Sequence, residues 1–202
     1  MSDRMFNASL AHRLDAPERT IWLPPAEVLR ALEVKPGEVI ADIGAGTGYF
    51  SLPLAEVVGP HGRVYAVDAQ SGMLVHLQKK MDSFGVSNIE PTHAEAAQTG
   101  LLSATCDLVL LANVWHEVAD RAAVLQESMR ILKVPGCIAV LDWRPDVEPE
   151  YGPPREHRLS ASTARSELLD AGFKDVSQRY IGRYSWLVQA RSGDREGNGS
   201  PL

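Results

Sequence analysis

Residues 39–50 read VIADIGAGTGYF, and this stretch decides the fold. Its first five residues are apolar apart from one acid, which predicts a short buried strand. Three glycines follow at alternate positions from Gly44 to Gly48, and residues 49–58 then carry apolar side chains at helical spacing. A strand, a glycine loop and a helix are typical of a mostly parallel α/β sheet that binds ligands beyond the carboxyl ends of its strands. Glycines let the backbone approach a ligand closely, and the helix start offers N–H groups to an anion.

The acid in this strand, Asp42, indicates a cationic ligand group. A carboxylate in an apolar strand is costly unless something pairs with it, and an acid just ahead of the first glycine would repel a pyrophosphate. The glycines also depart from the GxGxxG spacing of dinucleotide-binding proteins, because the third comes one residue early. The alternative is a glycine-rich turn that Asp42 merely caps.

Further polar residues stand at the ends of the neighbouring strands. Asp68 ends the second predicted strand, where a carboxylate can accept hydrogen bonds from both hydroxyls of a ribose. Asp68 can also cap the helix that follows, and the two roles are compatible. Glu95 follows a weak third strand, whose proline suits a sheet edge. Asn113 ends a fourth strand that is apolar throughout and is therefore expected at the centre of the sheet.

Taken in order, these features resemble the motifs of class I S-adenosylmethionine (SAM) methyltransferases. The resemblance is to small-molecule enzymes of the methyltransferase type 11 and ubiquinone/menaquinone-like group, and it covers roughly residues 34–190. It is weakest at the turn 133–137, where Cys137 replaces the second glycine of the family's Lys-Pro-Gly-Gly sequence. It implies S-adenosyl-L-methionine as cofactor and S-adenosyl-L-homocysteine as product.

The resemblance also implies individual roles for site residues. Asp42 would hold the methionine ammonium, Asp68 the ribose and Glu95 the amino group of the adenine. The expected cofactor-binding set is Asp42, Gly44, Ala45, Gly46, Gly48, Asp68, Ala69, Met73, Glu95, Ala96 and Asn113.

A candidate base follows the fourth strand. His116 and Glu117 come just after Asn113, where a substrate enters in the family, and histidine is well suited to accept a proton near neutral pH. We therefore predict His116 and Glu117 as catalytic residues. The alternative is that His116 is only hydrogen-bonded to a neighbour at a helix start.

A substrate lid is predicted at residues 144–159, a proline-rich stretch too long for a simple connection. Trp143 ends the fifth strand before it, and His157 and Arg158 near its end could recognise an anionic or polar substrate. A solvent-exposed loop with ordinary charges is the alternative.

The predicted fold is α/β and Rossmann-like, with a seven-stranded, mostly parallel sheet, an antiparallel C-terminal hairpin strand and helices on both faces. Residues 1–33 are expected to form an N-terminal helical arm or cap. Residues 34–191 would form the SAM-dependent methyltransferase domain, and residues 192–202 a disordered tail.

Composition limits the other possibilities. The chain has 202 residues, of which 45% are hydrophobic and 23% charged, and its net charge is −6, which suits one α/β domain. It has no block of basic residues and no run close to the ~20 apolar residues of a membrane span, so we expect neither nucleic acid nor a membrane as partner. The two cysteines have no metal-ligand spacing, which predicts no metal and a cytoplasmic protein with reduced thiols. The oligomeric state is left open.

The sequence thus predicts an enzyme that transfers a methyl group from SAM to a small-molecule acceptor by in-line displacement. Two alternatives remain at this point. One is a non-catalytic SAM-binding module, and the other is an NAD-dependent oxidoreductase, which the glycine spacing and Asp42 disfavour.

Overall fold

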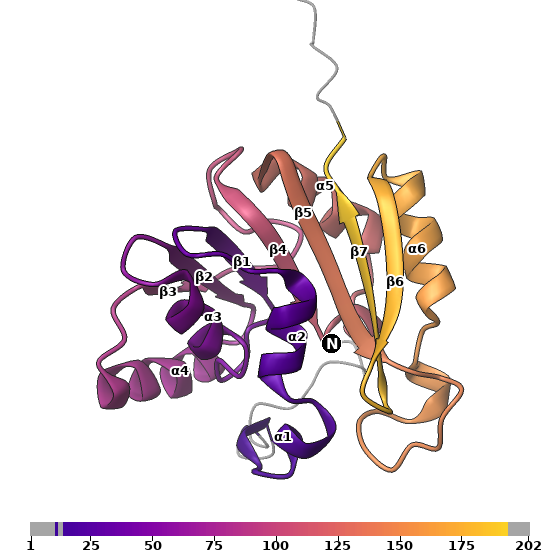
Figure 1. Ribbon diagram of the computed structural model, residues 1–202, viewed down its shortest axis with the longest axis horizontal. Coiled ribbons are helices and arrows are strands. Elements are labelled where there is room, and N and C mark those ends of the chain that lie inside the picture. The colour runs from indigo at the N-terminus through magenta and orange to yellow at the C-terminus, as the bar shows by residue number, and fades with distance from the viewer. Residues whose placement is uncertain (1–10, 12–13, 194–202) are drawn as a thin grey trace, which may run out of the picture.

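The computed structural model describes residue 11 and residues 14–193 of the chain. Within this part the strands form one seven-stranded sheet in the order β3-β2-β1-β4-β5-β7-β6 (Figure 1). Neighbouring strands from β3 to β5 run parallel, whereas β7 is antiparallel to both β5 and β6, which confirms the predicted sheet. The strands are β1 (Val39–Ile43), β2 (Arg63–Asp68), β3 (Ile89–His93), β4 (Cys106–Ala112), β5 (Leu132–Trp143), β6 (Lys174–Ile181) and β7 (Ser185–Arg191).

Helices cover both faces of this sheet, as predicted. Buried leucines, valines and a methionine of α2, α3 and α4 pack on one face, and those of α5 and α6 pack on the other (Figure 1). The α-helices are α1 (Arg19–Trp22), α2 (Pro25–Leu32), α3 (Ser51–Val58), α4 (Ser71–Phe84), α5 (Arg121–Ile131) and α6 (Ala161–Asp170). Two short 3-10 helices, η2 (Trp115–Glu117) and η3 (Arg155–His157), follow β4 and β5.

The order of the strands determines where a ligand can bind. The chain runs outward from β1 through β2 to β3 on one side, and then returns to β4 and β5 on the other. Ligands of open α/β sheets bind beyond the carboxyl ends of the strands at such a reversal. The parallel strands point toward the lower edge in Figure 1, where α1 and the loop 144–159 lie.

The central position of β4 is confirmed, because residues 108–111 are buried between helices on both faces. The proline-containing β3 forms an edge, also as predicted. Side chains cap two of the helices: Ser160 accepts a hydrogen bond from the Thr163 N–H at α6, and Asp120 accepts one from the Ala123 N–H at α5.

The predicted turn at residues 133–137 is wrong as a separate element, because β5 already begins at Leu132. Cys106 pairs with Leu132 and Leu108 with Cys137, so β5 advances five residues while β4 advances two. The intervening residues bulge out of the ladder. The sequence shows the proline and glycine there but not that pairing resumes on both sides of them.

Part of the N-terminal region packs into the core of the sheet, and the predicted domain boundaries stay a prediction. Leu23 and residues 28–32 of α2 contribute to the same core as the sheet. α1 starts at Arg19. Most of the predicted arm before residue 14 and the predicted tail from residue 194 lie outside the described residues. Ser192 is buried, and its hydroxyl forms hydrogen bonds with the backbone of Lys133 and Gly136 in β5.

Candidate functional site

A cavity of about 380 Å³ opens at the carboxyl ends of β1, β2 and β4. It is bounded by the glycine loop, the turns after β2 and β3, the residues after β4 and the segment before α1. Ten of the eleven predicted cofactor-binding residues line it: Asp42, Gly44, Ala45, Gly46, Asp68, Ala69, Met73, Glu95, Ala96 and Asn113. Residues that lie far apart in the sequence are thus brought to one place.

Gly48 is the predicted residue that does not line this cavity. A Cβ at Gly48 would lie 2.4 Å from Cδ1 of Leu77, and its φ is +84°. A Cβ at Gly44 would lie 2.8 Å from Val114 at a φ of +75°. Both glycines are therefore required by contacts within the protein and by left-handed backbone, and not only by a ligand as the sequence suggested.

The carboxylate of Asp42 lies at one end of the cavity and is only 2% exposed. Its Oδ2 accepts a hydrogen bond of 2.6 Å from the Ser51 hydroxyl at the start of α3. Burial raises the pKa of Asp42 to about 6, and the hydrogen bond from Ser51 offsets part of that effect. A positively charged ligand group would relieve the cost of this buried charge.

Asp68 ties the glycine loop to the end of β2. One carboxylate oxygen accepts the N–H of Gly46 and the other accepts the N–H of Gln70, each over 2.8 Å. Burial raises the pKa of Asp68, while these two backbone hydrogen bonds lower it. Because each oxygen can accept a second hydrogen bond, Asp68 can still bind a pair of hydroxyls.

Asn113 faces the cavity with an unused acceptor. Its φ of +57° turns the chain sharply at the end of β4, and its N–H donates to the Leu141 carbonyl over 2.7 Å. The side-chain Oδ1 is buried and has no hydrogen-bond partner among the described residues. A buried acceptor of this kind fits a ligand that brings a donor.

Arg19 is a site residue that sequence reasoning missed. Its guanidinium lines the cavity from α1, is 7% exposed and lies 3.9 Å from the centroid of the Tyr49 ring. Nη1 donates to the Leu14 carbonyl, whereas the buried Nε has no partner in the described chain. Burial lowers the pKa of Arg19 to about 10, so it remains charged at neutral pH. The position has no fixed spacing from the glycine loop, and an arginine before the first strand carries no recognisable motif.

Hydrogen bonds hold the segment before α1 against the glycine loop. The carboxylate of Asp15 accepts the hydroxyl of Thr47 over 2.7 Å, and Lys80 of α4 contacts the same oxygen at 2.5 Å. Leu14, next to it, lines the cavity. The segment therefore covers one side of the site and carries Arg19 into it.

The predicted base, His116, does not line the cavity, whereas Glu117 does. His116 is 5% exposed, and its Nδ1 lies 2.8 Å from Oδ1 of Asp142, which is the next-to-last residue of β5 and is fully buried. Its backbone N–H donates to the other oxygen of Asp142 over 2.8 Å. The Nε2 atom lies 3.6 Å from Oε1 of Glu117. The role of both residues in catalysis stays a prediction.

The three residues predicted to contact substrate, Trp143, His157 and Arg158, lie outside the cavity wall. The role of all three in binding substrate stays a prediction, and in this structure Arg158 contacts the loop itself. It donates to the carbonyls of Arg144, Tyr151 and Pro153 and lies over the Trp143 ring.

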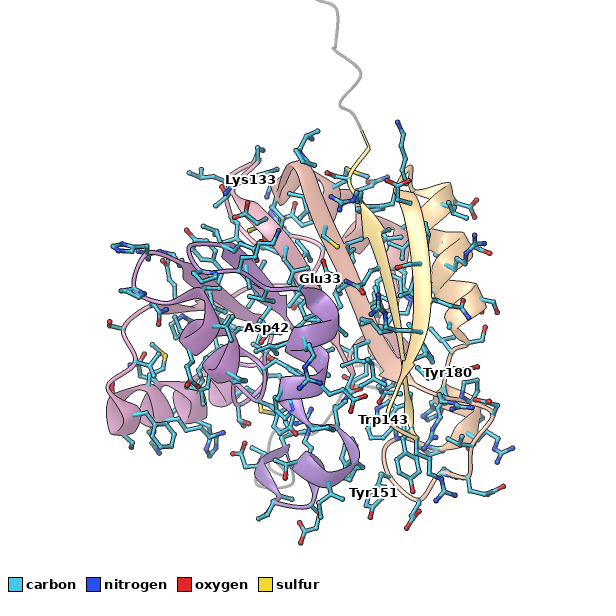
Figure 2. All side chains as sticks on the ribbon, in the orientation of Figure 1. Glu33, Asp42, Lys133, Trp143, Tyr151 and Tyr180 are labelled. Atoms are coloured by element: carbon cyan, nitrogen blue, oxygen red, sulfur yellow. The ribbon has the colours of Figure 1, made fainter. Side chains whose placement is uncertain are left out.

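The loop 144–159, which is the predicted lid, packs against α1 through aromatic side chains. The ring of Trp143 lies 4.8 Å from that of Trp22 in α1, and Tyr151 stacks on Trp22 at 5.3 Å. Figure 2 shows Trp143 and Tyr151 close together beyond the end of β5, at the lower edge of the sheet. A Cβ at Gly152 would lie 2.6 Å from the Trp143 ring. In this conformation the loop 144–159 is packed against α1.

Two other kinds of site are not found in the described part of the chain. No group of three or more histidine, cysteine or acidic side chains there could hold a metal ion. None of its helices is long and apolar enough to cross a membrane.

The polar groups that line the cavity match those of S-adenosylmethionine. Asp42 and Asn113 supply acceptors for an ammonium, Arg19 a cation for a carboxylate, and Asp68 a carboxylate for ribose hydroxyls. Small apolar side chains around Met73 leave room for a flat base. An acid faces the position that a pyrophosphate would need, which does not suit a dinucleotide.

Comparison with known proteins agrees with this fit. The family described as methyltransferase domain matches residues 40–136. The solved structure of a SAM-dependent methyltransferase from Aquifex aeolicus is 30% identical, covers 94% of this chain and 100% of its own, and has a TM-score of 0.89. The chain therefore belongs to the SAM-dependent methyltransferases, and its fold is of that class.

Curated relatives give narrower names. A demethylmenaquinone methyltransferase from Geobacillus stearothermophilus is 33% identical over 114 residues, 56% of this chain and 48% of the relative. One from Bacillus cytotoxicus is 31% identical over 116 residues, with similar coverage of 57% and 49%. The chain spans about half the length of these relatives. A phosphoethanolamine N-methyltransferase 2 from Haemonchus contortus, solved with S-adenosyl-L-methionine, is 14% identical, covers 83% of this chain and 51% of its own, and has a TM-score of 0.69, a likeness of fold alone.

Proposed function

We propose that the protein transfers a methyl group from S-adenosylmethionine to a small-molecule acceptor. The observation that carries this is a buried anion and a buried cation at the same cavity, Asp42 and Arg19, beside the unused acceptor of Asn113. An α-amino acid end carries both charges, whereas a dinucleotide carries neither there. The cofactor, when bound, supplies a methyl group on a positively charged sulfur, which is already electrophilic.

The chain's own residues bind and orient in this proposal. Asp42 and the Oδ1 of Asn113 accept from the ammonium, and Arg19 donates to the carboxylate. Asp68 accepts from the ribose, and Ala69, Met73, Glu95 and Ala96 bound the adenine, with Glu95 on the exposed rim. The backbone of Gly44, Ala45 and Gly46 forms the floor. Fixing the methyl donor against an acceptor in line with sulfur can supply up to ~7–11 kcal/mol of the barrier.

We further propose that the acceptor is a small molecule of the quinol type, such as the relatives' names indicate. The demethylmenaquinone methyltransferases are 31% and 33% identical to this chain over 116 and 114 residues, which is the support for this narrower statement. An arsenite acceptor is not favoured, because it would need several cysteines at the substrate site. Cys106 is fully buried, and neither Cys106 nor Cys137 is part of the cavity wall.

The test is transfer of labelled methyl from SAM to a panel of reduced naphthoquinones and phenols, followed by mass spectrometry of the product. We expect a methylated product with the wild-type protein and none with Asp42→Asn. Glu56→Gln, a substitution on the exposed side of α3, is the control and should be fully active. SAM binding without transfer to any acceptor would favour the non-catalytic SAM-binding module, and binding of NAD instead would favour the oxidoreductase.

A further inference from the structure

Three side chains form a line from the end of β5 to the cavity. Asp142 is fully buried, His116 contacts it through Nδ1 at 2.8 Å, and Nε2 of His116 lies 3.6 Å from Glu117. Glu117 lines the cavity and His116 does not. Glu117 is therefore the residue of the three that can touch an acceptor, and His116 contacts Glu117 on the side away from the cavity.

Asp142 fixes the state of the imidazole. A carboxylate accepts hydrogen bonds only, so the Nδ1 atom beside it carries a proton. The backbone N–H of His116 and that of Trp143 also donate to this carboxylate, which holds it in place. Nε2 is then the basic atom, and it points to Glu117.

The charges around His116 favour its taking up a proton. Burial alone lowers its pKa, but the hydrogen bond and charge of Asp142, with the charge of Glu117, raise it above the ordinary value overall. Arg158 is the cation facing it and acts the other way. Two carboxylates against one guanidinium stabilise an imidazolium in this position.

The cavity beside Glu117 favours an uncharged acceptor. Its neighbours in the wall there are Val114, Val118 and Ala119. Arg158 already donates to three loop carbonyls, and Arg121 donates to Glu167 and to the Val118 carbonyl. The charge of Glu117 opposes the approach of an anion, so an ionised acceptor binds more weakly than an uncharged one but can still react once it is bound.

We propose that Glu117, His116 and Asp142 form a proton relay, and that the acceptor is an uncharged phenol or enol whose O–H proton leaves through it. This rests on the proposed methyl transfer. As the acceptor's electron pair forms the new bond to the methyl carbon, the carbon–sulfur bond breaks and its electrons stay on sulfur. The acceptor's proton passes to the carboxylate of Glu117 and then to Nε2 of His116, giving an imidazolium beside Asp142 that later loses its proton to water.

The relay also limits the acidity of the acceptor. Carboxylate and imidazole bases are effective only when the proton donor is not far weaker as an acid than they are, which favours phenolic and enolic hydroxyls over alkyl alcohols. The distance of 3.6 Å is longer than a hydrogen bond, and such contacts commonly shorten when substrate binds. Glu117 is a catalytic residue in this proposal, and Asp142 is a positioning residue.

The experiment compares a naphthol with its para-nitro derivative at about pH 8, where the first is neutral and the second ionised. We expect Glu117→Gln to lower kcat for the naphthol by about 10²–10⁴-fold and to leave kcat for the pre-ionised nitro derivative within about threefold of wild type. The affinity of the Glu117→Gln variant for SAM, measured by calorimetry, should stay within about threefold of the wild-type value. Glu56→Gln should match wild type with both acceptors.

Asp142→Asn gives a second readout that does not depend on turnover. NMR of isotope-labelled imidazole nitrogens should show the proton of His116 moving from Nδ1 to Nε2, because an amide can donate to Nδ1. The variant should lose kcat for the naphthol but not for the nitro derivative. Thermal unfolding checks that the Asp142→Asn variant folds. If it does not fold, the kinetic comparison with Glu117→Gln still tests the proposal.

Each outcome bears on the proposal. Equal losses for both acceptors with Glu117→Gln, or no loss for either, would overturn the relay and leave a structural role. If the wild-type protein binds SAM but methylates neither acceptor, the acceptor class is wrong. If it does not bind SAM, the proposed function itself falls, and the relay falls with it.

Discussion

Replacing Asp42 by asparagine should make the protein more stable and unable to bind its methyl donor. The wild-type carboxyl has a pKa of about 6 in the folded state against 3.8 as its ordinary value. A difference of roughly two units corresponds to about 3 kcal/mol of unfolding free energy, which we take as an upper limit. The amide keeps the shape and can still accept the Ser51 hydroxyl, but it carries no charge.

The sign of this effect fixes its pH dependence. Because the folded-state pKa is raised, the stability contributed by protonated Asp42 is present below about pH 4 and is lost as the pH rises through about 6. The amide of the variant titrates nowhere in that range. The gain in stability of Asp42→Asn over wild type should therefore be small near pH 4 and reach its full value near pH 8, by up to about 3 kcal/mol.

Thermal and urea unfolding at these two pH values measure the difference. For a chain of this size, 3 kcal/mol corresponds to roughly 6–12 °C in Tm. SAM at a hundredfold its Kd should then stabilise the wild type by about 2.7 kcal/mol and the variant hardly at all. If the two proteins respond alike to pH and to SAM, the buried carboxylate neither costs stability nor binds the ammonium, and the reasoning is refuted.

Four further substitutions separate binding from folding. Arg19→Met should weaken the binding of SAM by about 10–100-fold in calorimetry, because a hydrogen bond from a charged group is lost. The affinity for methylthioadenosine, which lacks the amino acid end, should not change. Equal losses of affinity for both ligands would contradict the carboxylate contact. Gly48→Ala should lower the unfolding free energy by about 1–3 kcal/mol, because the new Cβ meets Leu77 and the residue has a positive φ. Gly72→Ala, where the space around the new Cβ is open, should raise the unfolding free energy by about 0.5–1 kcal/mol. Urea unfolding of the two variants measures the difference. Arg158→Met should speed proteolysis of the loop 144–159 with little change in SAM affinity, and a raised KM without faster cleavage would support its role as a substrate contact.

The sequence predicted the sheet and the cofactor side of the site well, for a physical reason. The glycine loop, Asp42 and Asp68 are local signals, because each is a polar or small residue at the end of an apolar strand. Parallel strands place their carboxyl ends at one edge, so such residues must meet there. Ten of the eleven predicted positions line one cavity, and their role in binding the cofactor stays a prediction.

Sequence reasoning failed where long-range contacts decide. Arg19 reaches the cavity only because α1 packs beside the glycine loop, and no periodicity encodes that. Arg158 has the right chemistry for an anion, and its contacts with three carbonyls of its own loop could not be read from the sequence. Asp142 has no signal beyond being an acid at the end of a strand, and its pairing with His116 depends on β4 and β5 lying side by side.

The central claim is that the buried acid ahead of the glycine loop binds the ammonium of an amino acid, and not a diphosphate. Calorimetric titration of the wild-type protein at about pH 8 with SAM, S-adenosylhomocysteine and NAD tests it most directly. The account predicts saturable binding of SAM and S-adenosylhomocysteine in the micromolar range and no heat from NAD. Saturable binding of NAD with no response to SAM would contradict it.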